Sequence, residues 1–440
     1  MLFGRMNTLD KDSSTQHIGF WGVVAIGVGG MVGGGIFAVL GLAVQLAEGG
    51  APLAFAVGGA VALLTAYSYS KLSVTFPGQG GTVTYLDRAF TPNVIVGAMN
   101  ILLWLSYIVM LSLYASAFGS YGAAFVSGSM QPLVRHILIS FSVVAIAGLN
   151  MLSADAIGKA ETWIVALKVT ILLFFVAVGL SQVNMSHVSS SSWAPPIQII
   201  AGGMIIFLAY EGFELIANTA HDVREPRKVL PRAFYTSVGF VIVLYILVAM
   251  VTVGSLSVDK IVGAKDYALA VAAEPFLGRM GFTLIACAAL LSTASAINAT
   301  LYGAARLSFT IAKEGELPEV LEKKVWRKPV EGLLITAAMT LIIANVFDIS
   351  SISTMGSAGF LLIFAAVNGA NLRLRRETGS NRWIPALGLL ACSGALVVLL
   401  WQTYTTAPAR LWTLAVMLVL AVTIEWLYRT FKRGEMRPLR

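Results

Sequence analysis

The chain alternates long apolar runs with short polar connections over almost its whole length. A helix needs about 20 apolar residues to cross the ~30 Å hydrocarbon core of a bilayer. Runs near or above this length are predicted to be membrane-spanning helices, over residues 18–47, 53–76, 94–126, 133–150, 160–182, 197–220, 233–255, 278–311, 331–347, 352–372, 384–403 and 409–429. The pattern therefore predicts an all-α integral membrane protein with a single transmembrane domain over residues 1–440.

The first predicted span contains the densest glycine run in the chain. Six of the nine residues from Gly27 to Gly35 are glycine, and each glycine costs a helix interior about 1 kcal/mol relative to alanine. Close helix packing through small residues is the alternative, but adjacent glycines cover every face of the helix, which favours a break. Lipid cannot pair the backbone groups that a break frees, so the break is expected inside protein or beside a wet cavity, where it can form a binding site.

The sixth predicted span carries a second interruption, because Glu211 and Glu214 flank Gly212 at mid-span. An acidic residue costs about 2.5–3.5 kcal/mol at the bilayer centre and is expected to face a partner or water. If residues 18–182 and 197–372 are two repeats, both breaks fall in the first span of a repeat, which indicates the midplane site of a transporter. Broken helices present N–H groups to a carboxylate and carbonyls to an ammonium. The predicted substrate is therefore a small-molecule amino acid.

Lys168 stands near the middle of the fifth predicted span, far from either polar flank. Snorkelling to the headgroups, the usual arrangement of a membrane lysine, is less favoured because the side chain is too short to reach them easily. Two interpretations remain. Lys168 forms a structural ion pair with Glu211 or Glu214, or it carries a proton, since burial in a low dielectric penalises the charged amine.

Composition agrees with a membrane protein, since 57% of the 440 residues are hydrophobic and 12% are charged, against about 25% charged in a typical soluble domain. The net charge is +8. If both termini are cytoplasmic, 24 of the 30 basic residues lie on the cytoplasmic side, five lie outside and Lys168 lies in mid-span. This distribution follows the positive-inside rule and predicts a multi-pass protein of the inner (cytoplasmic) membrane. The positive charge would face anionic membrane lipid, so no nucleic acid is needed as a partner.

Two connections have a recognisable character. Residues 256–277 are too polar to cross a membrane and helical in composition, so a short external helix pair is predicted there, as a lid or as a static cap. The outer loop with four serines at residues 189–192 is predicted to be a flexible connector.

Enzyme chemistry finds little support in the sequence. The four histidines are scattered at span edges, and neither an HExxH nor a GxSxG pattern is present. Cys287 and Cys392 both fall inside predicted spans, where they are expected to be small apolar fillers rather than a disulfide or a metal pair. No metal site, cofactor or catalytic residue is therefore predicted. A secondary transporter is favoured over an enzyme, a receptor or a passive channel.

Four motifs carry a family resemblance. They are Gly-Gly-Gly-Ile-Phe at residues 33–37, Tyr-x-Gly-Phe-Glu at 210–214, Glu-Pro-Arg-Lys-Val-Leu-Pro-Arg-Ala at 225–233 and Ser-Ala-Ile-Asn-Ala-Thr-Leu-Tyr at 295–302. Together they resemble the amino acid-polyamine-organocation (APC) superfamily, most closely its prokaryotic proton-coupled, broad-specificity amino acid transporters with a lysine in the fifth span. The resemblance covers nearly the whole chain. It implies the leucine-transporter fold, a 5+5 inverted repeat with two extra C-terminal helices over residues 384–429, hence 12 transmembrane helices.

The resemblance also implies how a substrate would bind. Its carboxylate would lie against backbone amides of the first break, those of Gly33, Gly34 and Gly35. Its ammonium would meet backbone carbonyls from both breaks, those of Met31, Leu208 and Glu211. An aromatic gate, or simple packing alone, is implied at Tyr210 or Phe207.

The resemblance further implies a site for proton coupling. Lys168 would occupy the second sodium site of sodium-coupled relatives, bonded to the Gly29 carbonyl and to the hydroxyl of Ser292 or Ser295. Loss of its proton would break these bonds and loosen the first span against the fifth and eighth. The expected function is amino acid:proton symport by alternating access. The alternative is an amino acid or amine exchanger without obligatory proton coupling.

The two acidic residues of the sixth span differ in their relation to the family. Glu214 is its common acid, either a structural anchor of the broken helix or a direct proton carrier. Glu211 departs from the family pattern, which is usually apolar at this position. Its side chain would recognise the distal cation of arginine, lysine or a diamine, or it would pair internally with Lys168. The first interpretation favours cationic substrates.

Overall fold

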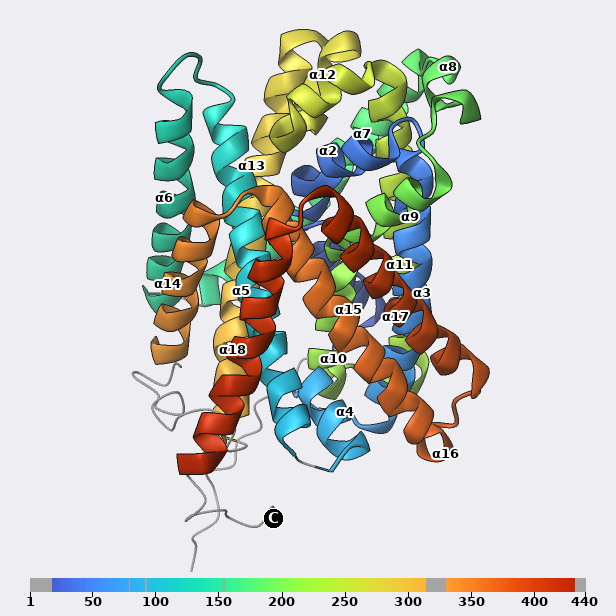
Figure 1. Cartoon of the computed structure of the whole chain (residues 1–440), viewed down its shortest axis with the longest axis vertical. Helices are drawn as coiled ribbons and strands as arrows, with labels where there is room; N and C mark the ends of the chain where they lie inside the picture. Colours follow the sequence, from blue (N-terminus) through green and yellow to red (C-terminus); the bar gives the residue numbers. More distant parts are fainter. Residues whose placement is uncertain (1–17, 79, 92, 153–154, 314–329, 432–440) are drawn as a thin grey trace, which may run out of the picture.

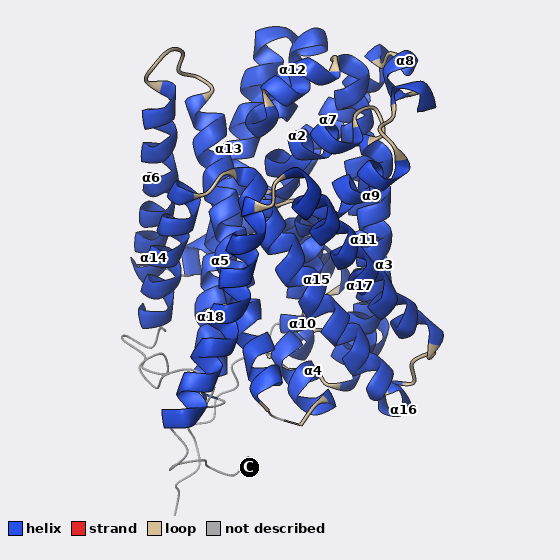
Figure 2. Ribbon diagram, viewed as in Figure 1, coloured by secondary structure: helices blue, strands red, loops and turns tan. Residues whose placement is uncertain are grey.

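The computed structural model describes residues 18–78, 80–91, 93–152, 155–313 and 330–431. In these segments every regular element is a helix, and no strand is formed (Figure 2). The long helices run along the bundle from one end to the other (Figure 1). They are α3 Ala51–Thr75, α5 Val94–Ala123, α6 Gln131–Leu152, α7 Asp155–Gly179, α11 Pro226–Ser255, α13 Ala268–Lys313, α15 Ile349–Arg373, α17 Trp383–Thr406 and α18 Ala409–Phe431. The prediction of an all-α protein is confirmed.

Membrane-crossing length is reached by nine described helices and by two bent helix pairs taken as single spans. The first pair is α1 Phe20–Met31 with α2 Gly35–Ala47, bent by 48°. The second pair begins with α9 Pro196–Ile205 and continues after a 42° bend through residues 207–218. A shorter apolar helix, α14 Val330–Val346, has 17 residues. Every predicted apolar run therefore coincides with helix, and both predicted interruptions are confirmed as bends.

Burial separates central from peripheral helices. In the most apolar window of each helix, 83% of the residues are buried in α5 and α15, but 28% in α6 and α17 and 22% in α18. The peripheral helices expose large apolar side chains such as Phe141, Leu390 and Trp412. Such an exposed apolar surface would be unfavourable in water and is suited to lipid. The two bent pairs lie among the inner helices (Figure 1).

Helix α4 (Gly81–Ala89) is an element that the sequence reasoning missed. Nine residues are too few to cross a membrane, and Asp87 with Arg88 makes the segment polar. One face of α4 buries Thr82, Val83 and Tyr85. The helix packs against α15 and the short helix α10 (Leu215–Asn218), at the lower end of the bundle in Figure 1.

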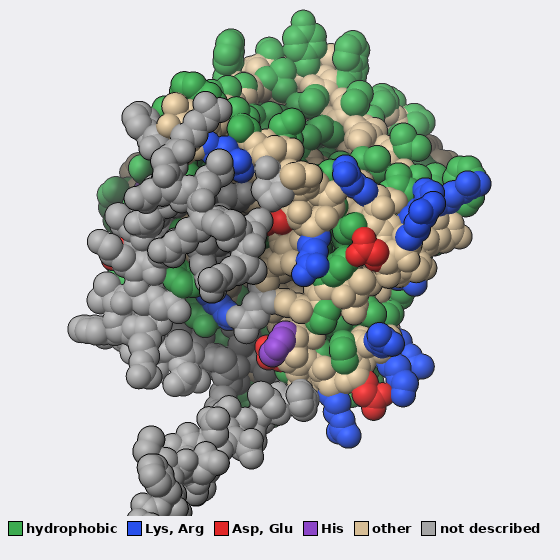
Figure 3. Space-filling model, turned by 90° about the horizontal axis from the view of Figure 1, so that it is seen from below, with side chains coloured by type: hydrophobic (Ala, Val, Ile, Leu, Met, Phe, Trp, Pro, Cys, Tyr) green, Lys and Arg blue, Asp and Glu red, His purple; other side chains and the backbone are tan. Residues whose placement is uncertain are grey.

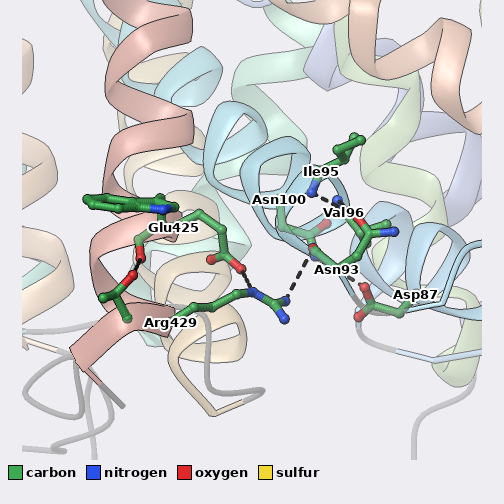
Figure 4. A network of polar contacts seen from close by, with 9 residues as sticks. Asp87, Asn93, Ile95, Val96, Asn100, Glu425 and Arg429 are labelled. Carbon is green, nitrogen blue, oxygen red and sulfur yellow. Dashed lines mark hydrogen bonds and ion pairs between the residues drawn. The ribbon is translucent and has the colours of Figure 1, made fainter. Parts of the chain in front are cut away.

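A polar network ties the last helix to α5 and α4 (Figure 4). Arg429 in α18 donates to the carboxylate of Glu425 one turn earlier and, from Nη2, to the Asn93 carbonyl at 3.2 Å. The Asn93 side chain caps the N-terminus of α5 by accepting from two backbone N–H groups. Two turns along α5, Asn100 donates to Asp87 of α4 at 3.3 Å. These contacts fix α18 and α4 to the buried helix α5.

The two predicted connections have different outcomes. Residues 256–277 form α12 (Val258–Gly263) and the first part of α13, which turns sharply at Gly278 with φ of 62°, so the helix pair is confirmed. It lies at the upper end of the bundle (Figure 1). The serine loop, expected to be a flexible connector, instead forms a 3-10 turn whose Ser192 carbonyl accepts from the backbone N–H of Gly49 at 3.0 Å. Local serine hydrogen bonds, which composition alone does not reveal, hold this turn.

Basic side chains gather at the lower end of the bundle, which carries α4 and α16 (Arg375–Thr378). Figure 3 views this end and shows several lysine and arginine side chains around its rim. The described ones from the connections at this end include Lys71, Arg88, Arg227, Lys228, Arg232, Arg373, Arg375, Arg376 and Arg382. These residues belong to the set that the sequence predicts to lie on the cytoplasmic side.

Candidate functional site

The first break separates α1 from α2 over the three residues Val32, Gly33 and Gly34. All three are buried, as is Met31 at the end of α1. Among the residues that the structure describes, no hydrogen bond is found from the backbone N–H groups of Gly33 or Gly34. Gly35 begins α2, where N–H groups have no intrahelical acceptor. This corner thus offers consecutive backbone donors at a helix N-terminus, an arrangement that favours an anion.

The second break follows α9. Residues Phe207–Glu214 form the 3-10 helix η3, and all eight are buried. A 3-10 run this long is unusual because its hydrogen-bond geometry is poorer than that of an α-helix. Four predicted substrate residues lie in it, namely Phe207, Leu208, Tyr210 and Glu211.

The two breaks cross in direct backbone contact at Gly30 and Gly212. A Cβ added to Gly30 would lie 2.6 Å from the Gly212 carbonyl oxygen, and a Cβ added to Gly212 would lie 2.2 Å from the Gly30 carbonyl carbon. No side chain fits at either position without moving a backbone. The glycines are therefore required for this approach as well as for the interruption itself.

Polar side chains from other helices pair the carbonyls freed by the first break. The Met31 carbonyl accepts from the Tyr245 hydroxyl of α11 at 2.6 Å, and the same hydroxyl lies 3.4 Å from the Ala209 carbonyl in η3. Ser292 of α13 donates to the Val32 carbonyl at 3.0 Å and also to the Gly33 carbonyl. Tyr245 thereby joins the two breaks to each other. This pairing is what irregular backbone at membrane depth requires.

Serine hydroxyls of helix α15 pair the backbone groups freed by the second break in the same way. The Ile205 carbonyl, the last of α9, accepts from Ser353 at 2.5 Å and from Ser357 at 3.0 Å. The backbone N–H of Leu208 donates to the Ser357 hydroxyl at 3.1 Å. The Leu208 amide is thus occupied, while its carbonyl is the group implied for substrate.

Lys168 lies in α7 with only 1% of its side chain exposed. Its Nζ donates to the Gly29 carbonyl in α1 at 3.0 Å. A Cβ added to Gly29 would lie 2.8 Å from a methyl of Val165, one turn earlier in α7, so the two helices touch here. Snorkelling to the headgroups is therefore wrong for this lysine. Ser292 and Ser295 are buried on α13, one turn apart.

The two acidic residues of η3 are both buried. Glu211 and Glu214 are 3% and 1% exposed and lie three residues apart in η3. The Glu214 carboxyl accepts from the hydroxyls of Tyr107 and Tyr69, the latter at 3.1 Å. The second break therefore holds two buried carboxyl groups, one of which accepts from two tyrosine hydroxyls.

Several of these hydrogen-bond partners were not predicted from the sequence. Tyr69, Tyr107 and Tyr245 are tyrosines within apolar spans, and Ser353 and Ser357 are small residues one turn apart. A buried tyrosine hydroxyl needs a partner, which is a signal that could have singled out the tyrosines. The serines resemble ordinary helix-packing residues and give no such signal.

Comparison with known proteins gives a consistent picture. A family profile described as "Amino acid permease" matches residues 18–424. The chain is 34% identical to an uncharacterized protein of Methanocaldococcus jannaschii, over 94% of this chain and 95% of that one. It is 33% identical to the inner membrane transport protein YbaT of Escherichia coli, over 94% and 96% of the two chains. It is 25% identical to the chloroplastic cationic amino acid transporter 9 of Arabidopsis thaliana, over 87% of this chain and 73% of that one.

Proposed function

This chain belongs to the amino acid permease family of the APC superfamily, whose members are membrane transporters rather than enzymes, and we propose that it is a secondary transporter that takes up amino acids by symport with protons. The observation that carries the proposal is the hydrogen bond between Lys168 and the Gly29 carbonyl, beside the crossing of two broken helices. A titratable amine thus touches the segment that would grip the substrate.

The architecture that we propose is the leucine-transporter fold. The bent pairs would open the two halves of a 5+5 inverted repeat, and α17 with α18 would be the two additional helices. Nine long helices, two bent pairs and the shorter α14 are compatible with 12 spans. The repeat halves would cover residues 18–182 and 197–372. Paired interruptions at corresponding positions support this arrangement.

The substrate would bind as a zwitterion between the breaks. The backbone N–H groups of Gly33, Gly34 and Gly35 would hold its carboxylate, supported by their position at the N-terminus of α2. Carbonyls of Met31, Leu208 and Glu211 would receive its ammonium. Aromatic rings of Phe207 and Tyr210 would close over the ligand, and the Tyr210 hydroxyl donates to the Phe55 carbonyl of α3 at 2.9 Å.

Coupling would work through the α1 contacts. A protonated Lys168 holds α1 to α7 through Gly29, while Ser292 holds the break to α13 and Ser295 lies one turn further along. Release of the proton would weaken the first contact and free α1 to move. Glu214, braced by two tyrosines, would anchor η3 or carry a second proton with Glu211. The basic lower end of the bundle would face the cytoplasm together with both chain termini, in the inner membrane.

Uptake into proteoliposomes tests the proposal. Each proteinogenic amino acid and the common diamines would be offered radiolabelled, with and without an acidic outside pH. Symport predicts accumulation that depends on the gradient and collapses with a protonophore. Accumulation that needs internal substrate and ignores the gradient would instead establish an exchanger. Absence of accumulation in both conditions would refute the amino acid assignment.

Replacing Glu211 by glutamine is expected to weaken competition by arginine, lysine and diamines by about tenfold relative to neutral amino acids. A hydrogen bond to a charged group is worth roughly 1.5–3 kcal/mol, and about 1.4 kcal/mol corresponds to tenfold in affinity. Glutamine removes the charge and keeps a polar side chain of similar size, and Glu211→Met removes the polar group as well. The measurement is a competition panel against uptake of a neutral substrate, which is the internal control. An unchanged ratio of cationic to neutral competition would assign Glu211 to a structural role.

Replacing Tyr245 by phenylalanine is expected to raise KM about fivefold with little change in the maximal rate. The ring stays, but the Met31 carbonyl loses its donor, a bond worth about 1 kcal/mol. The matched control is Tyr121→Phe, since Tyr121 is equally buried and donates to the Phe37 carbonyl at 3.1 Å, beyond the break. Equal KM values in the two variants would show that Tyr245 does not position the ammonium-binding carbonyls.

A further inference from the structure

An apolar groove opens on the outside of the bundle near its basic end. It has a volume of about 470 Å³ and lies between the last two turns of α15, the start of α17 and Phe90 at the end of α4. Its lining on α15 and α17 consists of alanine, glycine and leucine side chains, except for Arg373. A Cβ added to Gly369 would have only a ring carbon of Phe90 within 4 Å, at 3.8 Å. Gly369 therefore forms an open floor.

Arg373 stands at the mouth of this groove. It is exposed and is the last residue of α15, a helix long and apolar enough to cross a membrane. Its guanidinium lies over the ring of Phe90 at 5.7 Å, and no carboxylate pairs with it among the described residues. Arg375 and Arg376 follow within one turn, and all three are exposed.

We propose that this groove binds one anionic phospholipid, with an acyl chain along α15 and the phosphate on Arg373. Apolar lining toward the hydrocarbon and an unpaired guanidinium at its boundary match the two parts of such a lipid. Arginine binds phosphate with charge-assisted, often bidentate hydrogen bonds. Basic pockets between helices at the cytoplasmic side are typical sites for anionic headgroups. A zwitterionic lipid would fill the groove without using the charge.

The bound lipid would also contact α4. Phe90 caps α4 and forms one wall of the groove, so a lipid there would brace α4 against α15. The other end of α4 carries Thr82, whose hydroxyl is 2.7 Å from that of Tyr69, so α4 connects the groove to the network around Glu214. Binding itself does not depend on the transported substrate, so its test stands apart from the uptake assays.

Native mass spectrometry of the delipidated protein tests the proposal. With equal amounts of phosphatidylglycerol and phosphatidylcholine, the first lipid adduct is expected to contain phosphatidylglycerol about ten times as often as phosphatidylcholine. This ratio corresponds to about 1.4 kcal/mol in binding free energy. Arg373→Gln should reduce this preference to about one. Its control is Arg382→Gln, because Arg382 lies over the Trp383 ring at 4.7 Å in a similar exposed position outside the groove.

A second pair of variants tests the groove itself. Gly369→Leu should lower the first binding event for both lipids, whereas Gly394→Leu, at an exposed position of α17 with no atom within 4 Å of the added Cβ, should not. If Gly369→Leu does not fold, the comparison of Arg373→Gln with Arg382→Gln tests the proposal. The proposal is overturned if Arg373→Gln keeps the preference for the anionic lipid, or if glycerol 3-phosphate alone displaces the lipid. It is also overturned if Gly369→Leu leaves the lipid adduct unchanged and instead abolishes a dimer of the protein.

Discussion

Replacing Gly212 by alanine is expected to reduce uptake by at least about tenfold. The added Cβ would lie 2.2 Å from the Gly30 carbonyl carbon and 2.5 Å from the Met31 backbone nitrogen. These obstacles are backbone atoms, which cannot rotate away as a side chain does. Extra methyl groups in a packed core cost about 1–3 kcal/mol, and here the cost falls on the crossing that would hold the substrate.

The control for Gly212→Ala is Gly239→Ala. Gly239 lies in α11 with no atom within 4 Å of an added Cβ, so alanine there meets open space and suits the helix. Uptake and the amount of folded protein, measured by size-exclusion chromatography, would be compared in both variants. Wild-type uptake by Gly212→Ala would show that the two breaks separate during the working cycle and that their contact is dispensable.

The two breaks could be predicted from the sequence because their causes are local. Glycine density around Gly30 and carboxylates beside Gly212 each make a continuous helix unfavourable at that place. Chain length and hydropathy similarly determine the helices, since a span of about 20 apolar residues has few other solutions in a membrane. Helix α4 was missed because it is short and polar, and its place depends on neighbours that hydropathy does not report.

The partners of the breaks could not be predicted in the same way. Tyr245, Ser292 and Ser357 come from three different helices, and only their packing brings each hydroxyl to a freed backbone group. Glu211 illustrates the same limit, because the sequence left Lys168 and a cationic substrate as its partners. The structure adds the carboxyl group of Glu214 as its neighbour. Contacts between distant segments depend on the rotation and crossing angle of the packed helices, and a single sequence gives little information on either.

Replacing Lys168 by alanine is expected to abolish the response of uptake to external pH, so that the ratio of rates at acidic and neutral pH falls to about one. Protonated Lys168 donates to the Gly29 carbonyl, and its deprotonation would remove the attraction that holds α1 to α7. Alanine removes the titratable group and leaves α1 without this contact at every pH. The control is Lys71→Ala, because Lys71 also donates to a glycine carbonyl, that of Gly379 at 3.5 Å, but at the exposed end of α3.

Arginine at position 168 separates a proton-carrying role from a purely structural one. An arginine keeps a positive donor near Gly29 but stays protonated at any physiological pH. If Lys168 releases its proton in each cycle, Lys168→Arg should bind substrate yet transport it at least about tenfold more slowly, because α1 stays held to α7. If the lysine only fastens two helices, arginine should preserve both the rate and its pH dependence. Binding measured by thermal stabilisation, beside initial uptake rates over a series of external pH values, distinguishes the two outcomes, and full transport by Lys168→Arg would remove the basis for proton coupling at this site.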